Sequence, residues 1–500
     1  MRETIPPARS PRGATAFAAA AVALLLAAAY GWGLVRFAPI WEEPRRCLVA
    51  LEMTLTGDYV VPRLLGEPYL NKPPLQNWLI AAAAGFRPRR VTPAAARLVS
   101  LAAVAAMAAL AAAWPVARGT PFDRRLAALA FLTQGIVVQY GRTGETDALF
   151  SLWTTLALWL HARGARDGRP ALAWFWPQAA VGLGVLTKGL APLFFYPAAG
   201  LAAAWRRRAA AARGGEAGVR PAARPGPALA AAAAGLAAAL LVVAAWAAPY
   251  AARSDAAALA SRAAAETLRS GPAGRPASEF FRHLASFPLD VAAGLLPWSL
   301  ALAAAARPDA RRRWRAALRA DPALAVAAIA WAAAFAVLWL APGAKGRYLL
   351  PVAPAAAVAL SSLVACRRDA VRCGREARRI RVATAALAAA GLAYAAVHAF
   401  GQAPRRAARA DAARAAAREI ASRAADGRPV VGARDLPFAV AFELTRQLGR
   451  PLARQPPGAG AYWIVSTDGD RSSGARAGAV WTGGGIVLTS RAAGGDPPER

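Results

Sequence analysis

Three lysines are the residues of this chain whose type and spacing most strongly suggest chemistry. Lysine and arginine together number 61, and all but these three are arginine. A lysine ammonium is a compact point charge, whereas an arginine presents a broad planar fork. A lysine in a chain whose other basic residues are all arginine suggests a pocket that binds a phosphate at one point. The alternative is that these lysines lie at helix ends and extend their charge into water. The three motifs are Asn71-Lys72-Pro73-Pro74, Leu186-Thr187-Lys188-Gly189 and Ala344-Lys345-Gly346-Arg347-Tyr348.

Carboxylates close to these motifs could act on a hydroxyl group. Glu42 and Glu43 follow the first apolar segment, and Asp147 begins a later one. A carboxylate at a water-poor boundary can orient an acceptor hydroxyl or take its proton. The alternatives are a solvated acidic pair at Glu42 and Glu43 and, at Asp147, a charge that stabilises a helix N-terminus. His283, in a later loop, is either a hydrogen-bonding residue or a ligand.

The composition indicates a polytopic helical membrane protein. The chain has 500 residues, of which 57% are hydrophobic, and a mean hydropathy of +0.31. Apolar segments of about 20 residues, the length that a bilayer requires, recur along its first four-fifths. They are continuous rather than alternating, which argues against a β-barrel. The net charge of +33 lies mostly in short loops between these segments, so it indicates membrane orientation rather than nucleic-acid binding.

Arginine-rich loops predict the topology. Each cluster of arginines follows an even number of predicted crossings, which places all of them, and the N-terminus, on the cytoplasmic side. The count is about eleven transmembrane helices, with eleven to thirteen allowed, and the C-terminus lies outside. The predicted spans are 16–34, 93–117, 126–140, 147–162, 171–187, 189–205, 228–250, 289–306, 322–341, 349–366 and 382–400.

The same topology brings the lysine motifs to one membrane face. Residues 1–400 form the transmembrane domain, with a first outer loop at 37–92 and a second large one at 251–288. Within the first loop, 75–86 is apolar but too short to span, so an interfacial helix is expected there, and 43–56 is a candidate for a second one. Residues 401–500 change character and predict a small α/β domain on the outer side.

The order of these motifs resembles a known family. An acidic pair is followed by Glu-Met, Gly-Asp-aromatic-x-x-Pro, Tyr-x-x-Lys-Pro-Pro-Leu, an Asp that opens a helix, Leu-Thr-Lys-Gly and Ala-Lys-Gly-x-Tyr. Over residues 37–355 this is similar to the bacterial GT-C glycosyltransferases, the family 39-like branch that includes the aminoarabinose transferase of lipid A and protein O-mannosyltransferase-like proteins.

The resemblance implies an enzyme of the bacterial inner membrane that works at the periplasmic face. Such an enzyme moves a sugar from a polyprenyl (undecaprenyl) phosphate, usually with inversion, to a lipid or protein acceptor such as lipid A, with the bilayer as a further partner. By position, the catalytic carboxylates are Glu42, Glu43 and Asp147. The resemblance and the motifs together suggest for the donor phosphate Lys72, Lys188, Arg269, Lys345 and Arg347, and as further candidates Asp58, Tyr69, Glu266, His283 and Tyr348.

Three positions depart from the family pattern. Glu42 stands where the family usually has Asp, Asn71 where the aminoarabinose transferases tend to have Glu, and Thr267 where they have His. If those side chains hold a divalent metal in relatives, this chain has lost its ligands. A transporter and a non-catalytic lipid-phosphate-binding protein are alternatives from other classes, but the two halves show no internal repeat and the polar motifs gather at one face.

Overall fold

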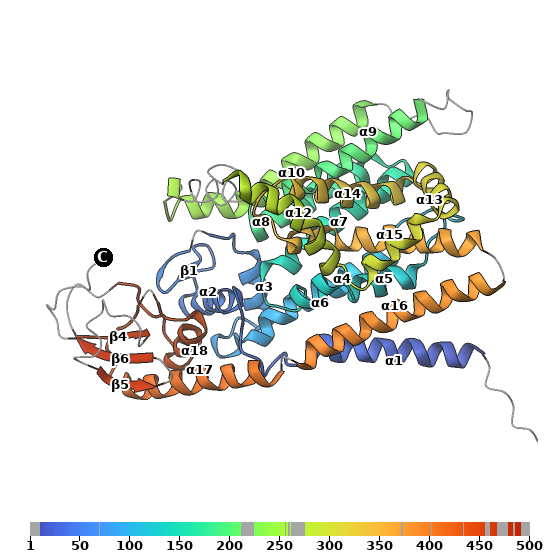
Figure 1. Cartoon of the computed structure of the whole chain (residues 1–500). Coiled ribbons are helices and arrows are strands. Elements are labelled where there is room, and N and C mark those ends of the chain that lie inside the picture. The colour runs from blue at the N-terminus through green and yellow to red at the C-terminus, as the bar shows by residue number, and fades with distance from the viewer. Residues whose placement is uncertain are drawn as a thin grey trace, which may run out of the picture.

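The fold was examined in a computed structural model of the whole chain (Figure 1). It describes residues 11–69, 71–211, 225–255, 257–258, 261, 276–371, 374–401, 403–433, 435–455, 461–467, 479–483 and 486–491. The α-helices are α1 (Pro11–Gly31), α2 (Glu43–Thr56), α3 (Leu75–Ala83), α4 (Pro93–Ala112), α5 (Arg124–Leu132), α6 (Gly135–Tyr140), α7 (Thr146–Asp167), α8 (Trp176–Lys188), α9 (Pro197–Ala211), α10 (Pro225–Ala251), α12 (Ala277–Gly294), α13 (Pro308–Ala320), α14 (Pro322–Trp339), α15 (Ala353–Ala370), α16 (Gly374–Gly401), α17 (Ala403–Arg423) and α18 (Phe438–Leu448). The strands are β1 (Arg63–Leu64), β2 (Glu67–Pro68), β3 (Val430–Gly432), β4 (Tyr462–Thr467), β5 (Ala479–Gly483) and β6 (Ile486–Arg491). Short 3₁₀ segments include η4 (Trp298–Ala306) and η5 (Gly346–Val352).

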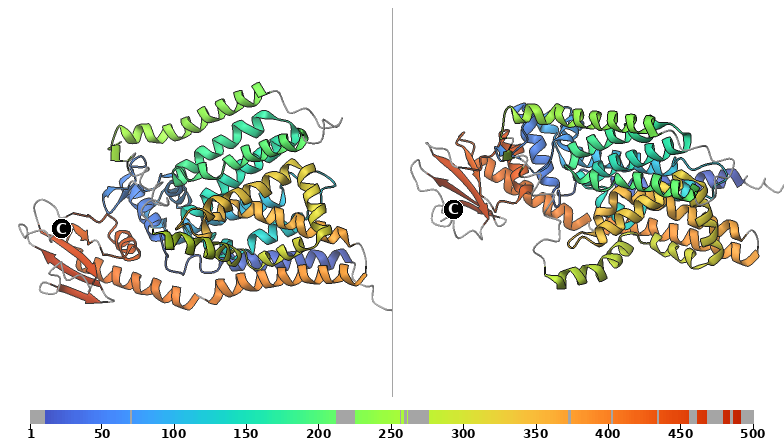
Figure 2. Two further views of the ribbon diagram at one scale, coloured as in Figure 1. Left: turned by 45° about the horizontal axis from the view of Figure 1, so that its top comes forward. Right: turned by 90° about the horizontal axis from the view of Figure 1, so that it is seen from above.

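The helices form a bundle around α7 and α15. Small residues, chiefly alanine, let helix axes approach closely, as on α14 and α15. The segment Gly346–Ala370 is 94% buried and lies at the centre of the bundle. By contrast, α10 is apolar on every side and its most apolar stretch is only 6% buried. A helix of this kind on the outer edge of the bundle (Figure 2) suits a bilayer rather than water.

Among the described residues, five helical segments are long and apolar enough to cross a membrane. A sixth results if α12 and η4, which meet at an angle of 109°, count as one broken span. Some other predicted spans are shorter or interrupted. The segment predicted at 126–140 is two short helices, α5 and α6, and α8 has 13 residues. The chain is thus mostly helical with several apolar helices, and the count of about eleven spans stays a prediction.

The C-terminal part contains a four-stranded sheet of order β3-β4-β6-β5. The pair β3–β4 is parallel and the other two pairs are antiparallel, with β4 and β6 paired from Tyr462↔Arg491 to Thr467↔Ile486. The helices α17 and α18 pack against each other beside the sheet. All views place this sheet at one end of the bundle, beyond α2 and β1 (Figures 1 and 2).

The first long loop, residues 37–92, and the C-terminal sheet share one hydrophobic core. Leu48 and Leu51 of α2 are buried in the same cluster as Ile420 of α17, Phe442 of α18 and Val465 of β4. The helix α2 therefore lies between α18 on one side and α3 and α4 on the other. Two helices expected in this loop, at 43–56 and 75–86, correspond to α2 and α3.

Candidate functional site

The centre of the candidate site is an ion pair between α7 and α8. Asp147 lies in the first turn of α7 and Lys188 is the last residue of α8. Because these two helices pack along each other, the Lys188 ammonium reaches the Asp147 carboxylate, and their side chains are only 20% and 14% exposed. The ammonium also lies 5.3 Å from the ring centre of Phe150 and 5.8 Å from that of Tyr348, so aromatic faces stabilise its charge.

Two more cations act on Asp147. The charges of Arg347 and Lys72 both stabilise its carboxylate electrostatically, after Lys188. The Arg347 guanidinium lies 5.5 Å from the Tyr140 ring centre, and its buried Nε–H has no hydrogen-bond partner among the described residues. Lys188 thus contacts Asp147 directly, and Arg347 and Lys72, from distant parts of the sequence, act on the same carboxylate.

Glu42 is linked to this cluster through the turn before α7. Its carboxylate accepts a hydrogen bond from Arg45 at 2.5 Å and is 3.5 Å from an Arg46 nitrogen, yet its side chain remains 47% exposed. The backbone N–H of Glu42 donates to the carboxylate of Glu145 at 3.3 Å. The contact with Glu145 places the first loop against the turn that carries Asp147.

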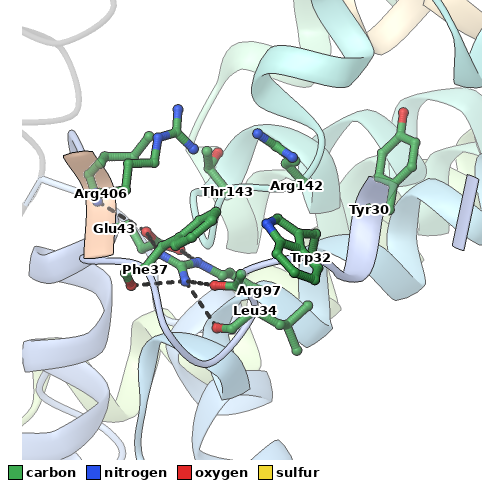
Figure 3. A pocket seen from close by; sticks show the side chains of 11 residues that line it. Tyr30, Trp32, Leu34, Phe37, Glu43, Arg97, Arg142, Thr143 and Arg406 are labelled. Atoms are coloured by element: carbon green, nitrogen blue, oxygen red, sulfur yellow. Dashed lines mark hydrogen bonds and ion pairs between the residues drawn. The ribbon is translucent and has the colours of Figure 1, made fainter. Parts of the chain in front are cut away.

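Glu43 has a different environment from its neighbour. It is fully buried and pairs with Arg97 of α4 through both carboxylate oxygens, at 2.7 and 2.8 Å (Figure 3). The backbone N–H groups of Gly144 and Ile40 donate to the same carboxylate. Arg97 also donates to the carbonyls of four residues of the preceding segment: Gly33, Leu34, Phe37 and Ala38. This network fixes the entry to α2.

Three other candidates have structural contacts. Tyr69 is buried and its hydroxyl accepts a hydrogen bond from Arg46. Asp58 accepts hydrogen bonds from the N–H groups of Val60 and Val61, while His283 contacts the Leu338 carbonyl at 3.0 Å. Lys345 is exposed and forms no ion pair with any residue that the structure describes. Glu266 and Arg269 lie outside the described residues.

Two acidic residues at the site were missed by sequence reasoning. Glu145 is buried, and burial together with the nearby Asp147 charge raises the pKa of its carboxyl to about 7. Its position two residues before Asp147 is the sequence feature that could have identified Glu145 as a site residue. Asp290 of α12 accepts a hydrogen bond from the Gly346 N–H at 2.7 Å and so holds the turn that carries Arg347. Nothing in the motifs pointed to Asp290.

The arrangement can bind an anion and handle a proton. Lysine and arginine side chains beside aromatic rings can hold a phosphate by charge-assisted hydrogen bonds. The half-exposed Glu42 contacts the turn before α7 through Glu145. In the described part of the chain, no three His, Cys, Asp or Glu side chains come together as a metal site.

Comparison with known proteins places part of this sequence in a family. Residues 71–215 match the family described as dolichyl-phosphate-mannose-protein mannosyltransferase. The undecaprenyl phosphate-aminoarabinose arabinosyl transferase 2 of Pseudomonas fluorescens is 31% identical over 154 residues, which is 30% of this chain and 26% of that protein. The corresponding Pseudomonas aeruginosa transferase is 32% identical over 155 residues, 30% of this chain and 27% of its own. These matches thus span about a quarter of the relatives' length.

The fold extends the similarity to nearly the whole chain. The crystal structure of ArnT from Cupriavidus metallidurans bound to undecaprenyl phosphate superposes with a TM-score of 0.65 at 16% identity. The superposition covers 96% of this chain and 98% of that one. The apo structure of the same protein gives a TM-score of 0.64. The sequence match over residues 71–215 and the fold match over almost the full length therefore support the resemblance of this chain to GT-C glycosyltransferases of the ArnT type.

Proposed function

We propose that this chain is a membrane glycosyltransferase that moves a sugar from a polyprenyl phosphate to an acceptor at the outer membrane face. The observation that carries the proposal is the mostly buried ion pair between Lys188 and Asp147. The charges of Arg347 and Lys72 act on the same carboxylate, and the half-exposed Glu42 contacts the adjoining turn through Glu145. The names of the relatives, which transfer aminoarabinose from undecaprenyl phosphate, favour a lipid acceptor such as lipid A. A protein acceptor is the second candidate, because the matching family is named for protein mannosyltransfer.

The reaction is a displacement at the anomeric carbon. The acceptor oxygen bonds to this carbon while the bond from the carbon to the phosphate oxygen breaks, and the electron pair leaves on the phosphate. Lys72, Lys188 and Arg347, with Lys345 at the rim, stabilise this leaving charge. Glu42 accepts the hydroxyl proton. Asp147 is less suited to that step because its side chain is only 14% exposed, whereas that of Glu42 is 47% exposed, so the role of Asp147 is to position the ammonium.

Glu43 is assigned a positioning role instead of a chemical one. Its carboxylate is fully buried and all its contacts are to protein groups: Arg97, Gly144 and Ile40. Removing one partner of such a buried pair leaves the other charge uncompensated. Glu43 thus holds the entry to α2, and with it Glu42, in place.

A transfer assay tests the proposal. Membranes that contain the full chain are incubated with radiolabelled undecaprenyl phosphate sugars and an envelope extract as acceptor. Label that moves from the lipid to lipid A or another glycan supports the proposal, and label in protein supports the second candidate. No movement of label from any donor, with folded protein present, would favour a non-catalytic lipid-phosphate-binding protein or a transporter.

The orientation proposed for the chain is that of a bacterial inner-membrane protein. The arginine-rich loops lie in the cytoplasm, and about eleven helices cross the bilayer with the N-terminus inside. The domain at 401–500 and the first outer loop then lie in the periplasm. Cysteine labelling from the outside at Glu67 and Asp411, two exposed positions, checks this assignment.

The C-terminal domain is proposed to position the first loop. The Arg45 guanidinium lies 4.6 Å from the ring centre of Phe438, the first residue of α18, and donates to Glu42. Leu65, at the tip of the β1–β2 hairpin, is buried in the shared core with Leu452. The route from Phe438 through Arg45 to Glu42 therefore links this domain to the proposed base.

Phe438→Ala is expected to lower kcat roughly two- to fivefold while the KM for the donor stays unchanged. A cation–π contact contributes about 0.5–1 kcal/mol, and its loss lets Arg45 and Glu42 move. Phe438→Tyr keeps the ring and should restore the rate. Val480→Ala, an exposed change on β5 of the same domain, serves as the control. Equal kcat for Phe438→Ala and the control would contradict the positioning role.

Glu145 predicts a pH dependence of stability. Because the pKa of its carboxyl is raised from 4.5 to about 7 in the folded chain, the folded state holds a proton that the unfolded state has released between these values. The contribution of this carboxyl to the free energy of unfolding is therefore fully present below the pKa of the unfolded state, and it is lost as the pH rises through about 7. A shift of this size corresponds to about 3 kcal/mol.

The measurement is the Tm in detergent from about pH 5 to about pH 8. The wild type should lose more Tm over this range than Glu145→Gln, in which the group does not titrate. Glu67→Gln, an exposed change on β2, should keep the wild-type slope. Parallel curves for wild type and Glu145→Gln would show that Glu145 is ionised throughout.

A further inference from the structure

Trp41 combines a strained backbone with an exposed side chain. Its φ is +53°, in the left-handed region that bulky residues rarely adopt. The residue is nevertheless 53% exposed, so no burial of the indole offsets this strain. Strained backbone that persists in a folded protein often marks a functional position. The strained backbone and the exposed indole together indicate that Trp41 binds a partner.

The indole is stacked on a second aromatic ring at the edge of the proposed site. The Trp41 and Tyr140 ring centres are 5.2 Å apart and their planes differ by 27°. Trp41 directly precedes Glu42, and Tyr140 ends α6 just before the turn that carries Glu145. The pair thus connects the first loop to the turn before α7.

The pair also borders the cation cluster. The Arg347 guanidinium lies 5.5 Å from the Tyr140 ring centre. The charges that act electrostatically on the Tyr140 hydroxyl are those of Arg347, Asp290, Glu145 and Asp147. A group bound to Trp41 and Tyr140 would therefore lie beside the phosphate that Arg347 is proposed to hold, and within reach of carboxylates.

We propose that Trp41 and Tyr140 form a platform for the sugar ring of the donor, an inference that rests on the proposed function. An aromatic face is apolar and weakly negative, and so it matches the C–H face of a pyranose. The carboxylates around the platform can accept hydrogen bonds from sugar hydroxyls or an amino group. The donor sugar is the occupant because it is joined directly to the phosphate beside Arg347.

Binding measurements on matched ligands test the platform without requiring turnover. The purified full chain in nanodiscs is titrated with undecaprenyl phosphate, undecaprenyl phosphate-aminoarabinose and undecaprenyl phosphate-mannose. The quantity of interest is the ratio of Kd values for the bare and the sugar-bearing lipid. For Trp41→Ala this ratio should fall roughly three- to tenfold, while the affinity for the bare lipid stays unchanged.

Two further variants separate the platform from a folding effect. Trp41→Gly removes the ring and suits the left-handed backbone, so it should lose the sugar contribution without loss of Tm. Trp32→Ala removes another exposed tryptophan, which contacts Phe400 edge to face, and should leave the ratio unchanged. If the Trp41 indole only anchored the chain in the lipid headgroups, Trp41→Ala would also leave the Kd ratio unchanged.

Each other outcome overturns the inference. An unchanged Kd ratio in Trp41→Ala removes the platform while leaving the proposed function intact. An equal loss for bare and sugar-bearing lipid would assign Trp41 to the phosphate or the fold. Failure of the wild type to bind any of the lipids would overturn the proposed function together with the platform.

Discussion

Asp147→Asn is expected to lower kcat for sugar transfer roughly 10²–10³-fold, the loss typical when one preorganised donor to a developing oxyanion is removed. The asparagine has nearly the same shape but no charge, so the Lys188 ammonium loses the partner that holds it between Phe150 and Tyr348. The rate falls because Lys188 no longer points at the leaving phosphate. Initial rates at saturating donor measure this effect.

The chain contains a matched control for this substitution. Asp167 is the last residue of the same helix, and its carboxylate pairs with Arg163 and Arg166 at a partly exposed site. Asp167→Asn makes the same chemical change about five turns away and should leave kcat within about twofold, as expected for a surface ion pair. If the two variants had equal rates, Asp147 would not belong to the mechanism.

The lysine motifs allowed part of this site to be predicted. Lys72, Lys188 and Arg347 lie far apart in the sequence, yet alternation of apolar helices and loops predicted one common face, and the structure brings their charges to Asp147. The helix α3 was also foreseeable, because its segment is apolar but too short to span. The periodicity and length of apolar segments predict helices and the order of loops because both depend on local sequence alone.

Contacts between distant segments could not be predicted in the same way. Glu42 and Glu43 are adjacent and identical in type, and only the position of Arg97 on α4 buries one and leaves the other half-exposed. The role of Asp290 depends on the contact between α12 and the turn at Gly346, which the sequence does not indicate. The shared core of α2 and α18 likewise depends on how the last hundred residues fold back.

The proposed base gives the second large effect. Glu42→Gln keeps the side-chain length and the contacts with Arg45, but an amide accepts no proton at the pH of the assay. General-base catalysis contributes about 10²–10⁴-fold, and we expect kcat to fall by that factor. The donor KM should change little, since Lys72, Lys188 and Arg347 remain in place.

Glu42→Asp distinguishes a base from a charge that merely organises the loop. The family usually carries Asp here, so the shorter side chain retains a carboxylate of the same chemistry, and its rate should lie between those of the wild type and Glu42→Gln. Glu67→Gln removes one negative charge from an exposed position of the same loop and should keep the wild-type rate. If Glu42→Gln were as active as Glu67→Gln, the proton would have another acceptor, and Glu145, whose carboxylate contacts the Glu42 backbone, would be the next residue to replace.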